Sequence, residues 1–208
     1  MDNLTTKQKI LEASIRLFNW NDVANVRLQQ IADETGISVG NLAYHFKNKE
    51  AIVTAVYEGL FEEFAHILSE YMMSPRLADF DHQMEQYYRF FSKYKFYLID
   101  LFEIERSHPL IMERWRESVD KMLLQIRKRL DYNVSRGVLK VEPVPGYYNE
   151  LANNIWMTTV FWVPKQMMKD LPVDEMMFKQ AVWTQIHPFF TPKGLNEFKL
   201  EVQPIMWS

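Results

Sequence analysis

The sequence predicts an all-α fold. Of its 208 residues only 6 are glycine and 9 are proline, the residues that most often interrupt helices. Apolar residues recur every three or four positions from end to end, whereas the alternating apolar and polar runs typical of exposed strands are missing. Hydrophobic residues make up 48% of the chain, which is enough for the buried core of a globular protein of this length.

Four helices are predicted in the first third of the chain. A Thr-x-x-Gln capping box at residues 5–8 starts the first helix, because each side chain can satisfy a free backbone donor there. A short second helix follows at 27–34. Ser38 is a suitable N-cap for a third helix at 38–46, and Asn48 is one for a long fourth helix that ends before Pro75.

The remainder of the chain is predicted to be helical as well. From about Asp79 the sequence is dense in Phe, Tyr, Trp and Met, and Pro or Gly turn signals divide it into segments. The predicted helices lie near 79–94, 95–106, 109–135, 147–169 and 174–190, with a further short helix in the stretch 191–208. No internal repeat or low-complexity tract is evident.

Composition excludes several classes of protein. The chain has no cysteine, which excludes disulfide frameworks, thiolate metal sites and cysteine nucleophiles. Its formal charge of −3 argues against a surface coated in basic residues, and residues 1–50 hold six basic and six acidic side chains. The most apolar stretch, residues 155–163, is too short to span a bilayer, and the N-terminus lacks a secretory apolar region. We therefore expect a cytoplasmic protein that does not enter a membrane.

Residues 27–46 have the spacing of a helix-turn-helix motif. Ala32 is small where two helices would cross, Gly36 can take the positive φ that the turn needs, and Leu42 fills the angle between the helices. Five polar residues on or next to the second helix are predicted to face outward: Ser38, Asn41, Tyr44, His45 and Lys47. Such a face suits a DNA groove, although a bare helix-turn-helix pattern has only modest specificity.

The flanking sequence makes the motif more specific. "TKQKILEASIRLF", followed by "VRLQQIADETGISVGNLAYHFKNKEAI", resembles the N-terminal DNA-binding domain of the TetR (tetracycline-repressor-like) family of transcriptional regulators. The resemblance covers about residues 5–55. It implies a helix-turn-helix DNA-binding domain at 1–50 and a larger helical ligand-binding and dimerisation domain at 51–208.

The resemblance also implies roles for individual residues. Ser38, Val39, Asn41, Tyr44 and His45 would lie on the recognition helix, with Lys47 beside them, and Lys49 and Arg27 would contact phosphate. Val39 is equally compatible with the core, and Tyr44 and His45 could instead cover the hairpin. The sequence departs from the family pattern at Ala43 and Val39, and "NWNDVANV" lacks the usual glycine. These departures concern the base preference and not the fold.

A dimer is predicted, because two recognition helices must lie about 34 Å apart to read adjacent half-sites of a palindrome. The family pairs the last two long helices of each subunit, here 147–169 and 174–190. An apolar stripe on the second of these helices is predicted to form the interface: Phe178, Ala181, Val182, Gln185, Ile186 and Phe189. The alternative for this stripe is the core of a single subunit.

A ligand pocket is implied by the resemblance in the middle helices. Flat aromatic side chains and flexible methionines suit an apolar or planar small molecule. The candidate residues are Tyr87, Phe90, Tyr94, Phe102, Trp115, Met122 and Trp156, each of which has core packing as its alternative. A ligand-released repressor is therefore the predicted function.

Catalysis is not expected, since phosphate-binding glycine loops, nucleophile elbows and paired metal histidines are missing. Glu63-x-x-His66 has the spacing of helix-bundle di-iron sites, and Asp79-x-x-His82 is a looser match. A second full motif and two more inward carboxylates would be needed, so we expect no metal and no cofactor. A helical module that binds a ligand or a protein but no DNA is the other alternative.

Overall fold

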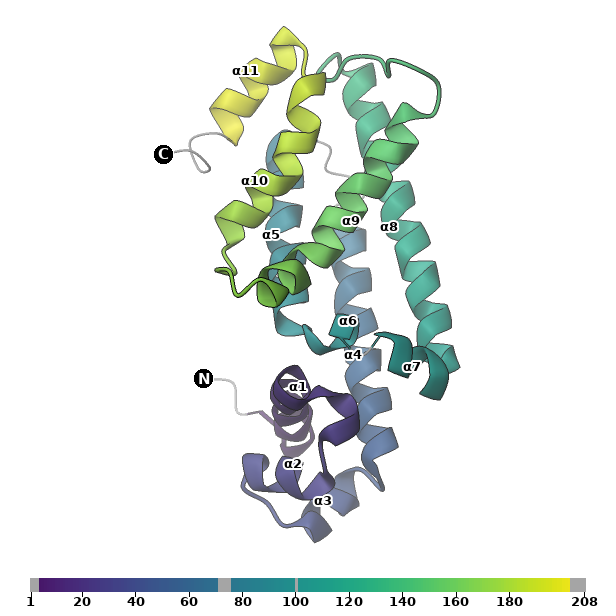
Figure 1. Ribbon diagram of the computed structural model, residues 1–208, viewed down its shortest axis with the longest axis vertical. Helices are drawn as coiled ribbons and strands as arrows, with labels where there is room; N and C mark the ends of the chain where they lie inside the picture. The colour runs from purple at the N-terminus through teal and green to yellow at the C-terminus, as the bar shows by residue number, and fades with distance from the viewer. Residues whose placement is uncertain (1–3, 71–75, 100, 203–208) are drawn as a thin grey trace. The chain divides into compact units, whose positions relative to one another are not determined.

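The computed structural model describes residues 4–70, 76–99 and 101–202, with the side chains of Ile99, Phe102 and Glu105 also outside the description (Figure 1). The helices are α1 (Thr6–Asn25), α2 (Leu28–Thr35), α3 (Val39–His45), α4 (Lys49–Glu70), α5 (Leu77–Lys93), α6 (Phe96–Ile99), α7 (Leu101–Ser107), α8 (Pro109–Ser135), α9 (Tyr147–Met168), α10 (Glu175–Ile186), the 3-10 turn η1 (His187–Phe189) and α11 (Pro192–Glu201). These ranges contain no strand, only an isolated antiparallel bridge between Leu139 and Phe190. The prediction of an all-α fold is confirmed.

Two predicted helices differ from the structure. The segment 95–106 forms two helices, α6 and α7, on either side of residue 100, which lies outside the described residues. The helix predicted at 174–190 ends at Ile186 and continues as η1. The reason is Pro188, which has no N–H to continue the α-helical hydrogen-bond ladder.

Contacts divide the chain into two compact units. The first unit comprises the described residues up to Glu63 together with Lys93–Trp115, and the second comprises Phe64–Ser92 together with the chain from Arg116 onward. All three limits between the units lie inside helices, because α4, α5 and α8 each contribute to both units. The division at residue 50 remains a prediction.

The first unit packs α1, α2 and α3 against the first part of α4 (Figure 1). The predicted capping box forms at its start, where the Gln8 side chain accepts the Thr5 N–H at 2.8 Å and the Thr5 hydroxyl accepts the Gln8 N–H. The core is made of fully buried side chains that the helical spacing brings inward: Ile10, Ala13, Phe18, Ile31, Ala32, Leu42 and Ile52. We term α1–α3 the headpiece.

The second unit has an aromatic core. Phe64 of α4 lies 5.1 Å from the ring of Phe90 and 6.0 Å from that of Tyr87, both on α5. The core also contains a buried ion pair, in which the Lys179 ammonium of α10 contacts the Asp81 carboxylate of α5 at 2.9 Å. The Trp183 indole N–H donates to the same carboxylate at 2.9 Å, so this buried charge is both paired and hydrogen-bonded.

The last helix, α11, closes one end of the second unit. Its Phe198 packs against the Trp183 ring at 5.1 Å, and its Glu197 contacts the Arg136 guanidinium at 2.7 Å. Gly194 lies so close to the Val138 carbonyl that a Cβ atom there would overlap it. The short helix predicted in 191–208 therefore corresponds to a packed element, and residues 203–208 lie outside the described residues.

The start of α9 is held by a carboxylate from the preceding loop. The Glu142 side chain accepts the backbone N–H of Tyr148 at 3.0 Å and contacts the Arg127 guanidinium at 3.2 Å. The hydrogen bond from the Tyr148 N–H, followed by that from Arg127, lowers the pKa of Glu142 below its ordinary value. None of the described helices has both the length and the apolar character needed to cross a bilayer.

Candidate DNA-binding site

The helix-turn-helix hairpin is formed by α2, α3 and the turn between them. Gly36 ends α2 with φ 73°, and its N–H donates to the Asp33 carbonyl at 3.1 Å. The next N–H, of Ile37, donates to the Ala32 carbonyl at 3.0 Å. Leu42, on the inner side of α3, is 0% exposed. A helix that ends in this way requires a residue in the left-handed conformation, which glycine adopts without strain. Gly36 therefore forms the turn that a helix-turn-helix motif needs.

The outer side of α3 is exposed, as a groove-binding helix requires. Tyr44 is 85% exposed, and Ser38 and Asn41 are exposed as well. The rings of Tyr44 and His45 meet edge to face at 5.3 Å, which positions the half-buried His45 against its neighbour. Val39 is also half-buried, so part of its side chain packs inward and part is open to contact with DNA.

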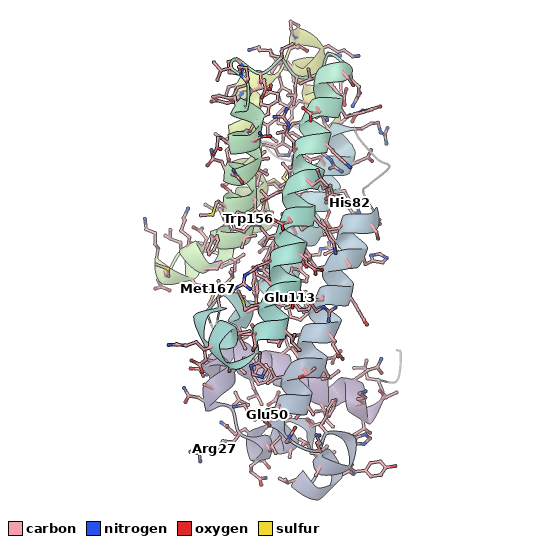
Figure 2. All side chains as sticks on the ribbon, turned by 90° about the vertical axis from the view of Figure 1, so that its right-hand side faces the viewer. Arg27, Glu50, His82, Glu113, Trp156 and Met167 are labelled. Atoms are coloured by element: carbon pink, nitrogen blue, oxygen red, sulfur yellow. The ribbon has the colours of Figure 1, made fainter. Side chains whose placement is uncertain are left out.

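Two of the predicted contact residues also have a local structural role. The Ser38 hydroxyl oxygen accepts the Asn41 N–H at 3.1 Å and so caps α3, and this bond does not use the O–H as a donor. Arg27 is the N-cap of α2, and its backbone N–H donates to the Gln30 side chain at 2.7 Å. Its guanidinium is exposed and lies on the outside of the headpiece (Figure 2).

Two predicted lysines stand at the junction of α3 and α4. Lys47 is exposed, whereas Lys49, the first residue of α4, is half-buried. The Lys49 ammonium donates to the carbonyl of Ala24, in the last turn of α1, at 2.8 Å. Lys49 therefore ties α4 to α1.

The stretch that lacks the usual glycine contains a strained residue. Asp22 lies in α1 at φ 59° and ψ 164°, a region that is nearly reserved for glycine. Its carboxylate accepts the backbone N–H and the side-chain N–H of Asn25, both at 2.8 Å. Hydrogen bonds thus hold a kink that a glycine would form freely, and sequence reasoning missed this residue.

The predicted pocket residues are divided between the two units. Tyr94 and Trp115 belong to the first unit, whereas Tyr87 and Phe90 belong to the second, as do Met122 and Trp156. The Phe102 side chain lies outside the described residues. Of the others, Trp156 is half-buried and the rest are at least nine-tenths buried. One small cavity of about 10 Å³ in the second unit is lined by other residues, including Leu77, Phe80, Arg129 and Ile155. The structure therefore does not bring the predicted set together around that space.

Half of the predicted dimer stripe belongs to the core of the subunit. Phe178 and Val182 are 0% exposed and Ile186 is 2% exposed, so assigning these three to an interface is wrong. They point inward because α10 packs on α9, where the Gln185 amide donates to the Thr158 hydroxyl at 2.7 Å. The other three stripe residues remain half-buried: Ala181, Gln185 and Phe189.

A different set of apolar side chains lies exposed on α9 and α10. Met157 is 49% exposed and Phe161 is 37% exposed on α9, while Met177 of α10 is 47% exposed. Met168, in the last turn of α9, is 87% exposed. Met157 and Phe161 are four residues apart and therefore share one side of α9.

The side chains of the Glu-x-x-His spacing considered for a di-iron site do not come together. The Glu63 carboxylate accepts hydrogen bonds from Lys93 at 2.6 Å and Tyr94 at 2.9 Å. The side chain of His66 is 76% exposed, and His82 contacts Glu85. Across the described ranges, no three His, Asp or Glu side chains gather in a way that could hold a metal ion.

Family comparisons agree with this geometry. Residues 10–56 match the family model "Bacterial regulatory proteins, tetR family", and residues 57–198, more than half of the chain, match "Bacterial transcriptional repressor". The HTH-type transcriptional regulator YerO of Bacillus subtilis (strain 168) is 44% identical over 52 residues, which are 25% of this chain and 18% of that protein. The aligned stretch is thus well under a third of this relative's length.

Solved structures extend the likeness to the whole chain. A TetR-family regulator from Marinobacter aquaeolei VT8 has a TM-score of 0.81 at 25% identity, covering 95% of this chain and 98% of that one. SmeT, the repressor of the Stenotrophomonas maltophilia multidrug efflux pump SmeDEF, shares the fold with a TM-score of 0.61 at 20% identity, over 92% and 94% of the chains. Another structure of SmeT is its complex with triclosan.

Regulators of this family bind DNA operators, usually as dimers that respond to small molecules. With a helix-turn-helix whose second helix is exposed, and family matches that together span residues 10–198, the chain belongs to the TetR family of bacterial transcriptional regulators, which are not enzymes.

Proposed function

We propose that this protein is a cytoplasmic homodimeric repressor that binds a palindromic operator and is released by a small apolar or planar molecule. The observation that carries the proposal is the exposed side of α3, where Tyr44 is 85% exposed above a fully buried Leu42. The DNA-binding domain would comprise residues 1–50 and the ligand-binding and dimerisation domain residues 51–208.

The contacts would divide between the DNA backbone and the bases. Tyr44, His45 and Lys47 would contact sugar and phosphate, since Tyr44 and Lys47 are exposed and His45 is half-buried beside Tyr44. Asn41 is exposed and carries both a donor and an acceptor, so it would read a base edge in the major groove. Ser38 would reach a phosphate through its O–H, and Val39 would meet a thymine methyl with the part of its side chain that is exposed.

Phosphate contacts would also come from Arg27 and Lys49. The Arg27 guanidinium is exposed at the start of α2, and Lys49 is anchored by the Ala24 carbonyl. The anchor would hold the ammonium in one position, which lowers the conformational entropy lost on binding.

The dimer would form through α9 and α10. The exposed side chains of Met157, Phe161 and Met177 support this surface, as do the half-buried Ala181 and Gln185. Interface cores are enriched in methionine and aromatic residues, as this surface is. Two headpieces paired in this way would have to reach half-sites about 34 Å apart.

The ligand would be apolar. The SmeT complex with triclosan shows that a protein of this fold binds a small aromatic molecule. In the second unit of this chain, Tyr87, Phe90, Met122 and Trp156 would provide aromatic and thioether contacts. Such a ligand releases DNA only if it binds the DNA-incompetent arrangement more tightly, and a coupling of roughly 1–3 kcal/mol is typical.

Selection of binding sites from random double-stranded DNA tests the proposal. We expect enrichment of a palindrome, with an affinity that falls steeply as salt rises. Lys47→Ala should lower the slope of log affinity against log salt by about one per half-site. Lys128→Ala, which removes an exposed lysine of α8 in the second unit, is the matched control.

The same experiment addresses the alternative of a helical module without DNA binding. The observation that favours this alternative is that residues 1–50 carry no net charge, whereas DNA-binding surfaces are usually basic. If a folded dimer enriches no palindrome, or if Lys47→Ala leaves the salt slope unchanged, the assignment of α3 to a DNA groove is refuted.

A further inference from the structure

A side-chain amide of the headpiece holds the turn between α5 and α6. The Asn19 Nδ2 atom of α1 donates to the carbonyl of Lys93, the last residue of α5, at 2.8 Å. Its Oδ1 atom accepts the N–H of Phe96, the first residue of α6, at 3.0 Å. Asn19 thus satisfies one acceptor and one donor that helix termini leave free, although it is more than seventy residues away in sequence. We term residues 93–96 the corner.

The corner is also held by aromatic packing. Phe96 is 0% exposed and lies 5.5 Å from the ring of Phe18, which precedes Asn19 on α1. On its other side the ring of Tyr57, from α4, lies 5.7 Å away and meets it edge to face. A side chain packed between two helices in this way cannot shift without moving at least one of them.

A third set of contacts joins the corner to α4. The Glu63 carboxylate accepts hydrogen bonds from the Lys93 ammonium and the Tyr94 hydroxyl, and the ammonium lies 4.7 Å from the centre of the Tyr94 ring. Burial raises the pKa of Tyr94 to about 12, so its hydroxyl remains a donor at neutral pH. The corner is therefore bonded to α1 through Asn19 and to α4 through Glu63.

The chain passes from one compact unit to the other at this corner. The residues of α5 up to Ser92 belong to the second unit, whereas Lys93 belongs to the first. In the first unit α1 packs on α2, and the Arg16 side chain of α1 contacts Glu34 of α2 at 3.0 Å. A displacement of the end of α5 would therefore reach α1 through Asn19, and would reach the hairpin through α1.

We propose that Asn19 is a positioning residue for DNA binding, which fixes the headpiece to the α5–α6 corner so that α3 is presented in one orientation. This inference rests on the proposed function, because it assigns to Asn19 the control of operator affinity. Asn19 itself would make no contact with DNA. Its loss would therefore weaken binding without removing a neutralised phosphate.

Three variants of the full-length protein separate the possibilities. Asn19→Ala removes both bonds, and Asn19→Asp keeps the acceptor but sets a carboxylate oxygen against the Lys93 carbonyl. Asn21→Ala is the matched control, because Asn21 lies on the same helix and its amide donates to the Leu17 carbonyl of that helix, at 3.5 Å.

Two readouts are needed, and only one involves DNA. The first is the affinity for the selected operator as a function of salt. The second is the distance distribution between spin labels at Glu12→Cys in α1 and Glu113→Cys in α8, both exposed positions of the first unit, in a chain that has no native cysteine. Labelled subunits diluted with unlabelled ones report only distances within one chain.

We expect Asn19→Ala to bind the operator about tenfold more weakly with an unchanged salt slope, and to broaden the distance distribution. Asn19→Asp should show the same changes to at least a similar degree, and Asn21→Ala should match the wild type. An Asn19→Ala protein that is folded by circular dichroism and keeps the wild-type distance distribution would overturn the inference. If no operator is enriched, the proposed function fails, while the distance measurement still decides whether Asn19 positions the headpiece.

Discussion

Replacing Asp22 by glycine and by alanine should have different effects on stability, although both changes remove the same carboxylate. Asp22 lies at φ 59° and ψ 164°, where a residue with a Cβ atom is strained by about 1–3 kcal/mol. Alanine keeps this strain and glycine does not. The carboxylate compensates in the wild type by accepting two hydrogen bonds from Asn25, both at 2.8 Å.

The magnitudes follow from these terms. Two hydrogen bonds at a half-exposed site contribute about 1–2 kcal/mol together, so Asp22→Ala should destabilise the protein by that amount. Asp22→Gly loses the same bonds and adds about 0.4–1 kcal/mol of unfolded-chain entropy, but it releases about 1–3 kcal/mol of strain. It should therefore lie within about 1 kcal/mol of the wild type, and about 1–2 kcal/mol above the alanine variant.

Thermal unfolding at a fixed protein concentration measures the difference, because the Tm of a dimer depends on concentration. For a chain of this length 1 kcal/mol corresponds to roughly 2–4 °C in Tm, so the glycine variant should melt about 2–8 °C above the alanine variant. Asp33→Ala is the control, since Asp33 accepts a hydrogen bond from Gln29 inside the regular helix α2. An alanine variant as stable as the glycine variant would refute the assignment of strain to Asp22.

Three further predictions concern the second unit. Gly194→Ala should destabilise it by about 2–3 kcal/mol in urea unfolding, because the new methyl group would overlap the Val138 carbonyl, and an unchanged midpoint would contradict this close approach. Lys179→Met should cost about 3 kcal/mol by leaving the buried Asp81 carboxylate without its cation, and adding Asp81→Asn should restore part of the loss if the charge is the cause. Because the pKa of Glu142 is lowered in the folded state, its contribution is present above the unfolded-state pKa and is lost as pH falls through the folded-state pKa. Glu142→Gln should therefore melt below the wild type at pH 7 and approach it below about pH 4, whereas a constant difference would exclude the carboxylate as the cause.

The helix-turn-helix could be predicted from the sequence because its determinants are local. Gly36 must take a positive φ, Ser38 must cap the next helix, and the spacing to Leu42 sets the buried side of α3. Each requirement is met by a residue type within a few positions of where it acts. The strained Asp22 was missed for the opposite reason, since its sequence context shows a missing glycine but not which residue takes the unusual conformation.

Dimer and pocket residues could not be assigned from periodicity. The helix α10 carries apolar side chains on two sides: Phe178 and Val182 face the subunit core, whereas Met177 is 47% exposed. A 3.6-residue stripe shows that a helix side is apolar, but it does not show whether the same chain or a second copy covers it. Tertiary packing decides which chain covers that side. The bonds from Asn19 to the corner also arise from tertiary packing and therefore could not be predicted from periodicity.

The placement of charges matters more than their sum in residues 1–50, which carry no net charge. Of the six acidic residues in 1–50, three are engaged within the headpiece. The Asp22 carboxylate bonds Asn25, that of Asp33 accepts from Gln29, and that of Glu34 contacts Arg16. Among the cations, Arg27 at the start of α2 and Lys47 after the end of α3 are exposed, and Lys49 is the first residue of α4. Because exposed charges act over about a Debye length of roughly 8 Å at physiological salt, a phosphate at α3 would respond to these nearby cations more than to the sum over fifty residues.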